Sequence, residues 1–159
     1  MKKVLVGNGG HAREVMAQMG LKLDRFVDDQ YVDDETFPIS KLNPEKHAVM
    51  IAVANSKDRF DIMTRLPKGI YFFNFIHPTA LIMDNVEIGE GSFIGAYSMP
   101  GVIVSGDVII GDVVYMGTNS SIREKLTIHS LCTIGMNSAV VKHIEQPGVY
   151  VGCPSKLVK

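Results

Sequence analysis

A short glycine-rich stretch near the start of the chain has the spacing of a phosphate-binding loop. Its residues are Gly7, Asn8, Gly9, Gly10, His11 and Ala12. Glycines let a loop approach a ligand closely, and the first turn of a following helix presents free N–H groups with about half a positive charge. We therefore expect these residues to bind the phosphates of a nucleotide. A turn that only packs a helix on a sheet is the alternative.

Other candidate ligand-binding residues follow the next apolar runs. Asp28 and Asp29 lie about twenty residues beyond the glycines, where a carboxylate can bond a ribose or a base edge. Asn55 and Arg59 follow a later apolar run, at the edge where ligands bind in open α/β sheets. Arg59 can meet a phosphate or lie solvated. His11 can face the sugar or phosphate of the ligand, or cap the helix.

A parallel sheet is needed to position these residues. Apolar runs predict strands over 3–6, 25–27, 48–53 and 71–75, and helical patterns lie at 11–19 and 57–66. This alternation is typical of a parallel sheet with helices packed on it. A dinucleotide normally needs a second mononucleotide-binding half, for which this part is too short, so a sugar nucleotide is favoured over NAD. We expect residues 1–76 to form a Rossmann-like domain that binds a sugar nucleotide.

From residue 77 onward, aliphatic residues recur every six positions, with one break. They are Ile82, Ile88, Ile94, Val104, Ile110, Met116, Ile122, Ile128, Ile134 and Val140. Neither a helix nor a strand has a six-residue period, whereas a solenoid of triangular coils does, with each aliphatic residue pointing inward. We expect residues 77–159 to form a parallel β-helix; an ordinary β-rich domain with chance spacing is the alternative.

Small residues accompany the aliphatic positions. Glycine follows the aliphatic residue at Gly89, Gly95, Gly111, Gly117 and Gly135. Small or β-branched residues fall four places after it, at Ser92, Ser98, Val108, Val114, Ser120, Cys132 and Ser138. We expect the small residues to fit tight corners and the glycines to relieve backbone strain there. The break holds four extra residues around Tyr97–Gly101, which predicts a loop pushed out of one coil.

Four stretches carry recognisable motifs: 4–15 with its Gly-Asn-Gly-Gly-His centre, 27–29, 76–80, and 140–158 with Gly-Cys-Pro-Ser-Lys near its end. They resemble the bacterial sugar O- and N-acetyltransferases related to sialic acid O-acetyltransferase, a group that includes the acetyltransferases of UDP-linked 4-amino sugars in the bacillosamine pathway. The resemblance implies an α/β domain that holds the nucleotide of an activated sugar. It also implies a left-handed β-helix that forms a homotrimer, with acetyl-CoA between neighbouring subunits. On this basis we expect Gly117, Gly135, Gly152 and Lys156 to contact acetyl-CoA.

Acetyl transfer needs a base for the attacking amine or hydroxyl and an N–H donor for the oxyanion. The resembled family commonly carries a His followed by Asp or Glu. The matching stretch here, 105–112, has Gly106 at the His position and Asp107 as the acidic partner, and a second alignment on 118–125 places Glu124 at the base position. Three readings stay open. An amine attacks with little help; Asp107, Glu124 or His129 serves as the base; or the protein binds without catalysing.

The bulk composition favours a protein of one or two small soluble domains. The chain has 159 residues, of which 46% are hydrophobic, and a formal net charge of −1, so nothing predicts a nucleic-acid or membrane partner. No apolar run approaches the length of a signal-peptide core or a membrane span. Cys132 and Cys153 fit no metal-ligand spacing and are expected to be buried thiols of a reducing cytosol.

Three hypotheses of function follow. The first is a cytoplasmic, acetyl-CoA-dependent acetyltransferase that acts on a nucleotide-linked sugar, and on an amino sugar in particular, in surface-glycan synthesis. The second is a sugar-nucleotide-binding or scaffolding protein that lacks the usual base. The third is a nicotinamide-dependent oxidoreductase built on the glycine loop, and it leaves the C-terminal half unexplained.

Overall fold

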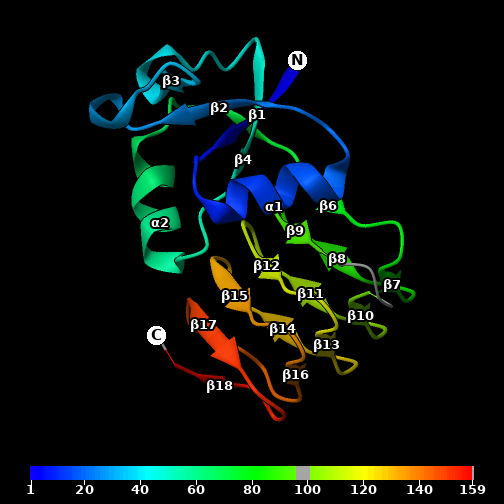
Figure 1. The fold of residues 1–159 in the computed structure, drawn as a ribbon. Coiled ribbons are helices and arrows are strands. Elements are labelled where there is room, and N and C mark those ends of the chain that lie inside the picture. Colours follow the sequence, from blue (N-terminus) through cyan, green and yellow to red (C-terminus); the bar gives the residue numbers. More distant parts are fainter. Residues whose placement is uncertain (96–100, 159) are drawn as a thin grey trace.

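The computed structural model describes residues 1–95 and 101–158. It has two parts (Figure 1): a sheet with helices at one end of the molecule, and a column of short strands stacked beneath it. The predicted loop around Tyr97–Gly101 lies, except for Gly101, outside the described residues.

The N-terminal part is a five-stranded sheet in the order β3-β2-β1-β4-β5, in which all neighbouring strands are parallel. The strands are β1 Lys2–Val6, β2 Asp24–Val27, β3 Thr36–Pro38, β4 His47–Ile51 and β5 Tyr71–Phe72. The helices are α1 Gly10–Met19 and α2 Ser56–Arg65, with the 3₁₀ turns η1 Asp29–Tyr31 and η2 Ile39–Lys41. The expected strands and helices are therefore present. The assignment of this part as a Rossmann-like nucleotide-binding domain stays a prediction.

Each face of this sheet is covered by one helix. Val4 and Val6 share a buried cluster with Ile62 of α2, whereas Leu5 packs with Ala12 and Val15 of α1. Successive side chains of a strand point to opposite faces, so a continuous apolar run such as β1 fits a strand that is buried on both sides.

Two features of this part differ from the prediction. β3 pairs with β2 at the sheet edge, and no strand is expected there from the sequence. The strand expected over 71–75 is two strands. β5 joins the α/β sheet, whereas β6, Phe75–Ile76, pairs with β9 of the lower column.

The column is a triangular parallel β-helix. Its strands are β6 Phe75–Ile76, β7 Leu81–Ile82, β8 Glu87–Ile88, β9 Phe93–Ile94, β10 Ile103–Val104, β11 Ile109–Ile110, β12 Tyr115–Met116, β13 Ser121–Ile122, β14 Thr127–Ile128, β15 Cys132–Ile134, β16 Ala139–Val140, β17 Gly148–Val151 and β18 Lys156–Leu157. They form three sheets: β16-β13-β10-β7, β14-β11-β8, and β18-β17-β15-β12-β9-β6. We name these the β7 face, the β8 face and the β6 face. Each coil passes through them in that order.

The hexapeptide prediction is confirmed. The eight aliphatic residues from Ile94 to Val140 are at most 2% exposed, and Ile82 and Ile88 at the top coil are partly buried against the same core. Equivalent residues on successive coils lie 18 positions apart in the lower coils, as for Asn119 and Asn137. They lie 22 apart across the break, as for Asn85 and Asp107. The four extra residues thus belong to one coil.

The glycines after the aliphatic positions have a different role from the one expected. Gly89, Gly95, Gly111, Gly117 and Gly135 are not among the residues with positive φ. Four of them are needed because the next coil lies too close for a side chain, whereas a Cβ on Gly95 would meet the Phe93 ring and Gln18 of α1. A Cβ on Gly111 would lie 2.6 Å from Ser130 N, and one on Gly117 would lie 2.8 Å from Met136 N.

Non-glycine residues occupy most of the left-handed corner positions. Positive φ angles of 54° to 63° occur in the column at Asn85, Asp107, Val113, Asn119, Lys125, Leu131 and Asn137. Asparagine and aspartate tolerate this region, whereas a β-branched residue such as Val113 is strained there. Val113 and Leu131 are nevertheless buried, because their corner packs into the cluster that also contains Val4, Val6 and Leu66.

The two parts of the molecule share a packed seam. Phe75, Phe93 and Tyr115 stack on successive coils of the β6 face, with ring centroids 5.3 and 5.5 Å apart. They form part of the cluster that holds Leu5, Ala12 and Val15. Helix α1 therefore lies between the α/β sheet and the top of the β-helix (Figure 1).

Candidate functional site

The glycine loop lies where the strand order of the sheet reverses. β1 has β2 on one side and β4 on the other, so the loops after β1 and β4 leave in opposite directions. In open α/β sheets this is the usual place for a ligand. Gly7 has φ +130°, and a Cβ there would lie 2.6 Å from Ala52 O, so only glycine lets the two loops meet. Helix α1 starts without a side-chain cap or an acidic residue in its first turn. Its first N–H groups are therefore open to an acceptor.

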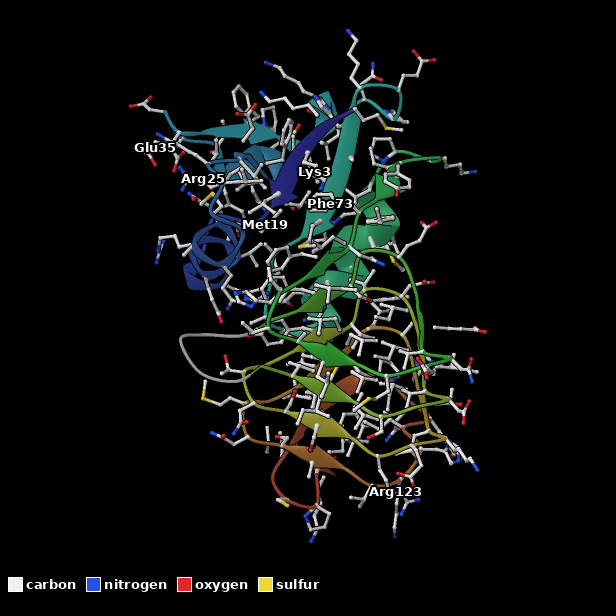
Figure 2. All side chains as sticks on the ribbon, turned by 90° about the vertical axis from the view of Figure 1, so that its right-hand side faces the viewer. Lys3, Met19, Arg25, Glu35, Phe73 and Arg123 are labelled. Carbon is white, nitrogen blue, oxygen red and sulfur yellow. The ribbon has the colours of Figure 1, made fainter. Side chains whose placement is uncertain are left out.

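Asn8 and three charged residues hold the loop from outside. The Asn8 Oδ1 accepts a hydrogen bond from Arg25, and Arg25 also pairs with Glu35 at 2.6 Å. Figure 2 shows Arg25 and Glu35 together at the outer edge of the α/β part. Arg13 donates to the carbonyl of Asn8 at 3.3 Å. The sequence reasoning missed Arg25 and Arg13, since both are ordinary surface residues by type.

The acidic pair after β2 already has protein partners. Asp28 forms an ion pair with Arg65 at the end of α2. Asp29 accepts a hydrogen bond from the Ser40 backbone N–H at 3.2 Å, and hydrogen bonding from Ser40 lowers the pKa of its carboxyl. These contacts fix the turn after β2. A role for either carboxylate in binding a ribose stays a prediction.

Asn55 caps helix α2. Its side-chain oxygen accepts from the backbone N–H groups of Lys57 at 2.9 Å and Asp58 at 3.3 Å. This satisfies two of the four N–H groups that a helix start leaves free. A contact between Asn55 and a ligand stays a prediction.

Arg59 is neither solvated nor exposed to a phosphate, which corrects both expectations for it. It is 2% exposed, and its guanidinium bridges the two parts of the molecule. It donates to the carbonyls of Val53 and Ala54 after β4, to the carbonyl of Cys132 at 3.0 Å and to the Thr133 hydroxyl at 2.9 Å. Burial lowers the pKa of Arg59 to about 10, so it remains charged at neutral pH.

His11 faces the β-helix instead of capping α1. Its Nδ1 lies 3.3 Å from Glu14 Oε2, and its ring meets the Tyr115 ring edge-on at 4.5 Å. The Glu14 carboxylate also accepts from the Tyr115 hydroxyl and from Gln18 Nε2, each at 3.2 Å. The hydrogen bond from His11 is the main cause that lowers the pKa of Glu14, whereas burial raises the pKa of Tyr115.

The expected acetyl-CoA residues lie together along one corner of the β-helix. Gly117 and Gly135 directly follow β12 and β15 on successive coils, and Gly152 follows β17 of the same sheet. The structure thus places these residues, with Lys156 of β18, at the corner between the β6 and β7 faces. Gly117 is buried under the next coil, whereas Gly152 and Lys156 are exposed. Their contact with acetyl-CoA stays a prediction.

The expected base candidates lie at other corners. The corner between the β7 and β8 faces holds Gly106 and Asp107 on one coil and Glu124 on the next. The Asp107 carboxylate accepts a hydrogen bond from Asn85 Nδ2 at 3.0 Å. His129 is exposed after β14, at the corner between the β8 and β6 faces. One chain therefore does not bring the base candidates and the acetyl-CoA candidates together.

Neither cysteine indicates a metal site. Cys132 is buried in the β-helix core, and burial raises the pKa of its thiol to about 11. Cys153 is exposed, so the expectation that both thiols are buried is wrong for it; it lies in the loop between β17 and β18 rather than on an inward position. Among residues 1–95 and 101–158, no group of three or more His, Cys, Asp or Glu side chains has metal-binding geometry.

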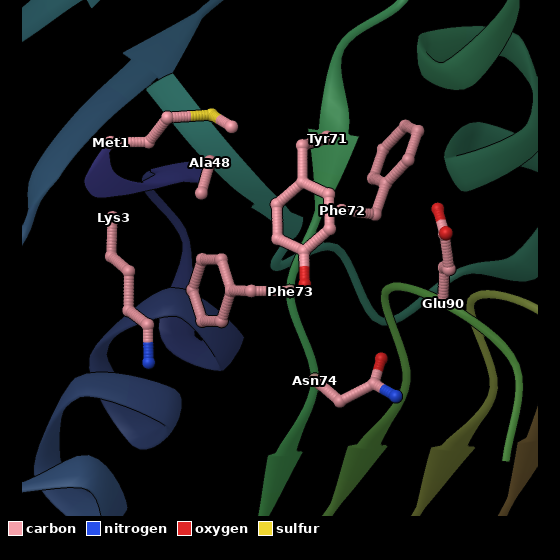
Figure 3. Close-up of a pocket in the computed structure, with 8 residues that line it drawn as sticks. All are labelled: Met1, Lys3, Ala48, Tyr71, Phe72, Phe73, Asn74 and Glu90. Atoms are coloured by element: carbon pink, nitrogen blue, oxygen red, sulfur yellow. The ribbon is translucent and has the colours of Figure 1, made fainter. Parts of the chain in front are cut away.

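A pocket lies at the opposite end of the sheet from the glycine loop. This pocket of about 530 Å³ is lined by the start of β1, by residues around β5 and by Glu90 (Figure 3). The Lys3 ammonium lies 5.0 Å from the centre of the Phe73 ring, and Asn74 accepts from the Ser92 backbone N–H. The Lys3 ammonium and the Asn74 amide oxygen therefore already have partners within the chain.

Comparison with known proteins identifies the class of fold. The structure matches PerB from Caulobacter crescentus, solved with CoA and GDP-perosamine, with a TM-score of 0.65 and 19% identity over 100% of this chain and 98% of that one. It matches the acetyltransferase domain of PglB from Neisseria gonorrhoeae with a TM-score of 0.61 and 21% identity over 99% of both chains. It matches WeeI from Acinetobacter baumannii with a TM-score of 0.54 and 24% identity over 99% of this chain and 100% of that one.

The sequence match covers less of the chain than the structural matches do. A curated relative, the probable mitochondrial UDP-3-O-acylglucosamine N-acyltransferase 2 of Arabidopsis thaliana, is 30% identical over 94 residues, which are 58% of this chain. The chain spans only 31% of the length of that relative, and no family model matches the sequence.

These matches define the protein as one with the fold of the left-handed β-helix acetyltransferases. The resemblance to hexapeptide-repeat sugar acetyltransferases is therefore confirmed at the level of the fold, over the whole chain. The expected co-substrate agrees with neighbours that were solved with CoA or acetyl-CoA. No helix in the described part of the chain is both long and apolar enough to cross a bilayer.

Proposed function

We propose that this protein transfers the acetyl group of acetyl-CoA to the amino group of a nucleotide-linked sugar. The observation that carries the proposal is the likeness over the whole chain to a structure solved with CoA and GDP-perosamine. The open glycine loop at the strand-order reversal supports it, because helix N–H groups there suit a diphosphate. The wider setting, cytoplasmic synthesis of a surface glycan, stays a prediction.

The proposal includes a homotrimer in which the site is shared. Asp107 and Glu124 lie at one corner of the β-helix, and Gly117 and Gly135 lie at another. A neighbouring copy would bring these two corners together. Exposed Leu81 and Ile103, 50% and 42% exposed on the β7 face, offer an apolar surface for such a contact.

Transfer is tested by the release of CoA thiol. The protein is supplied with acetyl-CoA and a panel of UDP-, dTDP- and GDP-linked amino sugars, and the same sugars with a hydroxyl in place of the amine separate N- from O-acetylation. We expect thiol release with at least one amino sugar and a product heavier by one acetyl group. A folded protein that releases no thiol with any of them contradicts the proposal.

Gly9 gives a matched pair of variants for the nucleotide site. A Cβ on Gly9 meets no atom within 4 Å, and its φ of −79° suits any residue, so substitution leaves the fold intact. Gly9→Asp places a negative charge against the expected phosphates, whereas Gly9→Asn has the same shape without the charge. We expect the KM for the sugar nucleotide to rise at least tenfold more in the Asp variant, with the KM for acetyl-CoA unchanged.

A non-catalytic sugar-nucleotide-binding protein is the second candidate. The observation that favours it is Gly106, at the position where the resembled family commonly carries its base histidine. Calorimetry separates the two functions. Binding of the sugar nucleotide together with acetyl-CoA supports the transferase, whereas nucleotide binding without acetyl-CoA binding supports the second candidate.

A further inference from the structure

The proposed transfer needs a group that accepts a proton from the attacking amine, and all five histidines are described by the structure. In a neutral imidazole one ring nitrogen carries a proton and the other carries a lone pair, so the partner of Nδ1 determines what Nε2 can do. A histidine whose Nδ1 accepts a hydrogen bond carries its proton on Nε2, and Nε2 then has no lone pair to offer.

Three of the five histidines are of that kind. Nδ1 accepts a backbone N–H from Asn43 in His47, from Thr79 in His77 and from Thr127 in His143, at 3.1 to 3.2 Å. Each of these side chains closes a local turn or strand end. None of the three has a base nitrogen directed away from the backbone.

His11 and His129 are of the other kind. The Nδ1 of His129 lies 2.8 Å from the carbonyl of Ser130, and the Nδ1 of His11 lies 3.3 Å from Glu14 Oε2. A carbonyl and a carboxylate only accept hydrogen bonds, so Nδ1 carries the proton in both residues and Nε2 keeps its lone pair.

The surroundings of the two side chains favour His11 over His129 as the group that takes up the proton. His129 is exposed, and its partner is a neutral carbonyl. The side chain of His11 is 10% exposed and pairs with a carboxylate, which stabilises the imidazolium that forms when a base takes up a proton. The His11–Glu14 pair therefore has the arrangement of a general base with an orienting acid.

The position of His11 suits the acceptor sugar. It follows Gly10 directly, in the first turn of α1, while its ring lies 4.5 Å from that of Tyr115 on the β6 face. A sugar attached to a diphosphate at Gly9 and Gly10 would lie next to the residue that follows them. That residue is His11.

We propose that His11 is the general base of the reaction, with Glu14 as its positioning residue. This inference rests on the proposed function. The amine nitrogen attacks the thioester carbonyl carbon while Nε2 of His11 takes one proton from it. The C–S bond of the tetrahedral intermediate then breaks, and the imidazolium returns that proton to the thiolate, so that acetyl-CoA and the amine become the acetamide and free CoA.

The charged and titratable groups that face His11 are few. Glu14 lies on the same helix as His11, and Tyr115 lies on β12. Burial raises the pKa of Tyr115, and the charge of Arg59 on α2 lowers it by less. The Glu14 carboxylate accepts three hydrogen bonds, from His11, Tyr115 and Gln18, and these hold both of its oxygens in place.

The test compares three histidine variants in the full chain. We expect His11→Asn to lower kcat by about a hundredfold or more, because a general base contributes roughly 10²–10⁴ in rate. The KM for both substrates should stay close to that of the parent protein, and the variant should remain folded. His143→Asn, which replaces one acceptor of a backbone N–H by another, is the matched control and should keep full activity.

Two further measurements separate a base from a structural residue. Added imidazole should restore part of the activity of His11→Ala and none of that of Glu14→Gln. Glu14→Gln should lower kcat without raising the KM for the sugar nucleotide, and Glu14→Asp should recover part of the loss.

The possible outcomes separate the assignment of His11 as the base from the proposed acetyltransferase function. An active parent protein whose His11→Asn variant keeps its kcat overturns the assignment and leaves the transferase standing. A loss of kcat in His129→Asn, with kcat unchanged in His11→Asn, also overturns the assignment and leaves the transferase standing. A folded parent protein that transfers no acetyl group to any amino sugar of the panel overturns both.

Discussion

Among single residues, Arg59 links the two parts of the molecule by hydrogen bonds to both of them. It is a buried cation, and among the described residues it forms no ion pair with an acid; its partners are backbone carbonyls and the Thr133 hydroxyl. Arg59→Met would remove the guanidinium donors from the Cys132 carbonyl and the Thr133 hydroxyl, both on buried residues. We expect a loss of about 3 kcal/mol in the free energy of unfolding, measured by urea denaturation.

Arg65→Met is the matched control for that measurement. Arg65 lies on the same helix, but its ion pair with Asp28 is partly exposed, with side chains 47% and 28% accessible. Exposed ion pairs contribute less than about 1 kcal/mol. Equal losses in the two variants would contradict the role given to Arg59.

The sequence could not have revealed this role of Arg59. Its type and its place after a strand suggest a phosphate ligand, whereas its β-helix partners lie 72 to 74 positions away and are mostly backbone atoms. Every residue has a backbone carbonyl, so residue type does not indicate which carbonyl accepts a hydrogen bond from Arg59. The sequence indicated His11 as a candidate because it adjoins the glycines. Its pairing with Glu14 could not be predicted, because it depends on which side of α1 packs against the β-helix.

At the scale of elements, the corner between the β8 and β6 faces combines backbone strain with packing. Val113 has φ +54° and is 3% exposed, whereas Lys125 has φ +59° at an exposed corner of the neighbouring edge. Lys125→Gly removes strain and loses little contact, so we expect it to stabilise the protein by up to about 1 kcal/mol. Val113→Gly removes the same strain but empties a buried site.

We expect Val113→Gly to destabilise the protein by about 1–2 kcal/mol, because the lost burial exceeds the strain relieved. Urea denaturation of both variants gives the comparison. If both substitutions stabilise the protein, the corner at Val113 is not held by its packing against the α/β part.

The strands of the β-helix were predictable because each coil repeats one rule. An inward aliphatic every six residues needs no knowledge of distant contacts, and the positions from Ile94 to Val140 follow it. β3 was not predictable, since its three residues, Thr36–Pro38, have no apolar alternation. The aromatic stack had an unused signal: Phe75, Phe93 and Tyr115 each stand directly before an aliphatic position.

The seam around Glu14 also affects how the protein responds to acid. The pKa of Glu14 is held below its ordinary value of 4.5, mainly by the hydrogen bond from His11. A carboxyl group with a lowered pKa in the folded state stabilises the fold above its unfolded pKa, and this contribution is lost as the pH falls through the lower, folded value.

We therefore expect Glu14→Gln to be less stable than the parent protein at about pH 6, with a difference that shrinks below about pH 4.5. Thermal midpoints of both proteins across this range provide the check. A difference that stays constant down to about pH 3 would show that the Glu14 charge does not stabilise the seam.

At the scale of the whole molecule, the β7 face is the exposed surface that the proposed trimer would cover. We expect light scattering to give three times the chain mass. We expect Ile103→Asp to shift the particle toward one chain mass, because it places a charge on the apolar contact. Lys22→Asp, exposed in the turn after α1, is the control and should leave the trimer intact. A parent protein that is monomeric at micromolar concentration contradicts the shared site.

The central claim is that one site between the glycine loop and the β-helix brings an acceptor sugar to an acetyl thioester. A crystal structure with CoA and a nucleotide-linked amino sugar tests it most directly. We expect the diphosphate at Gly9 and Gly10, the pantetheine arm along the corner of Gly117 and Gly135, and the sugar amine within hydrogen-bond reach of His11 Nε2. A complex with CoA bound elsewhere, or with the sugar directed away from the β-helix, would contradict it.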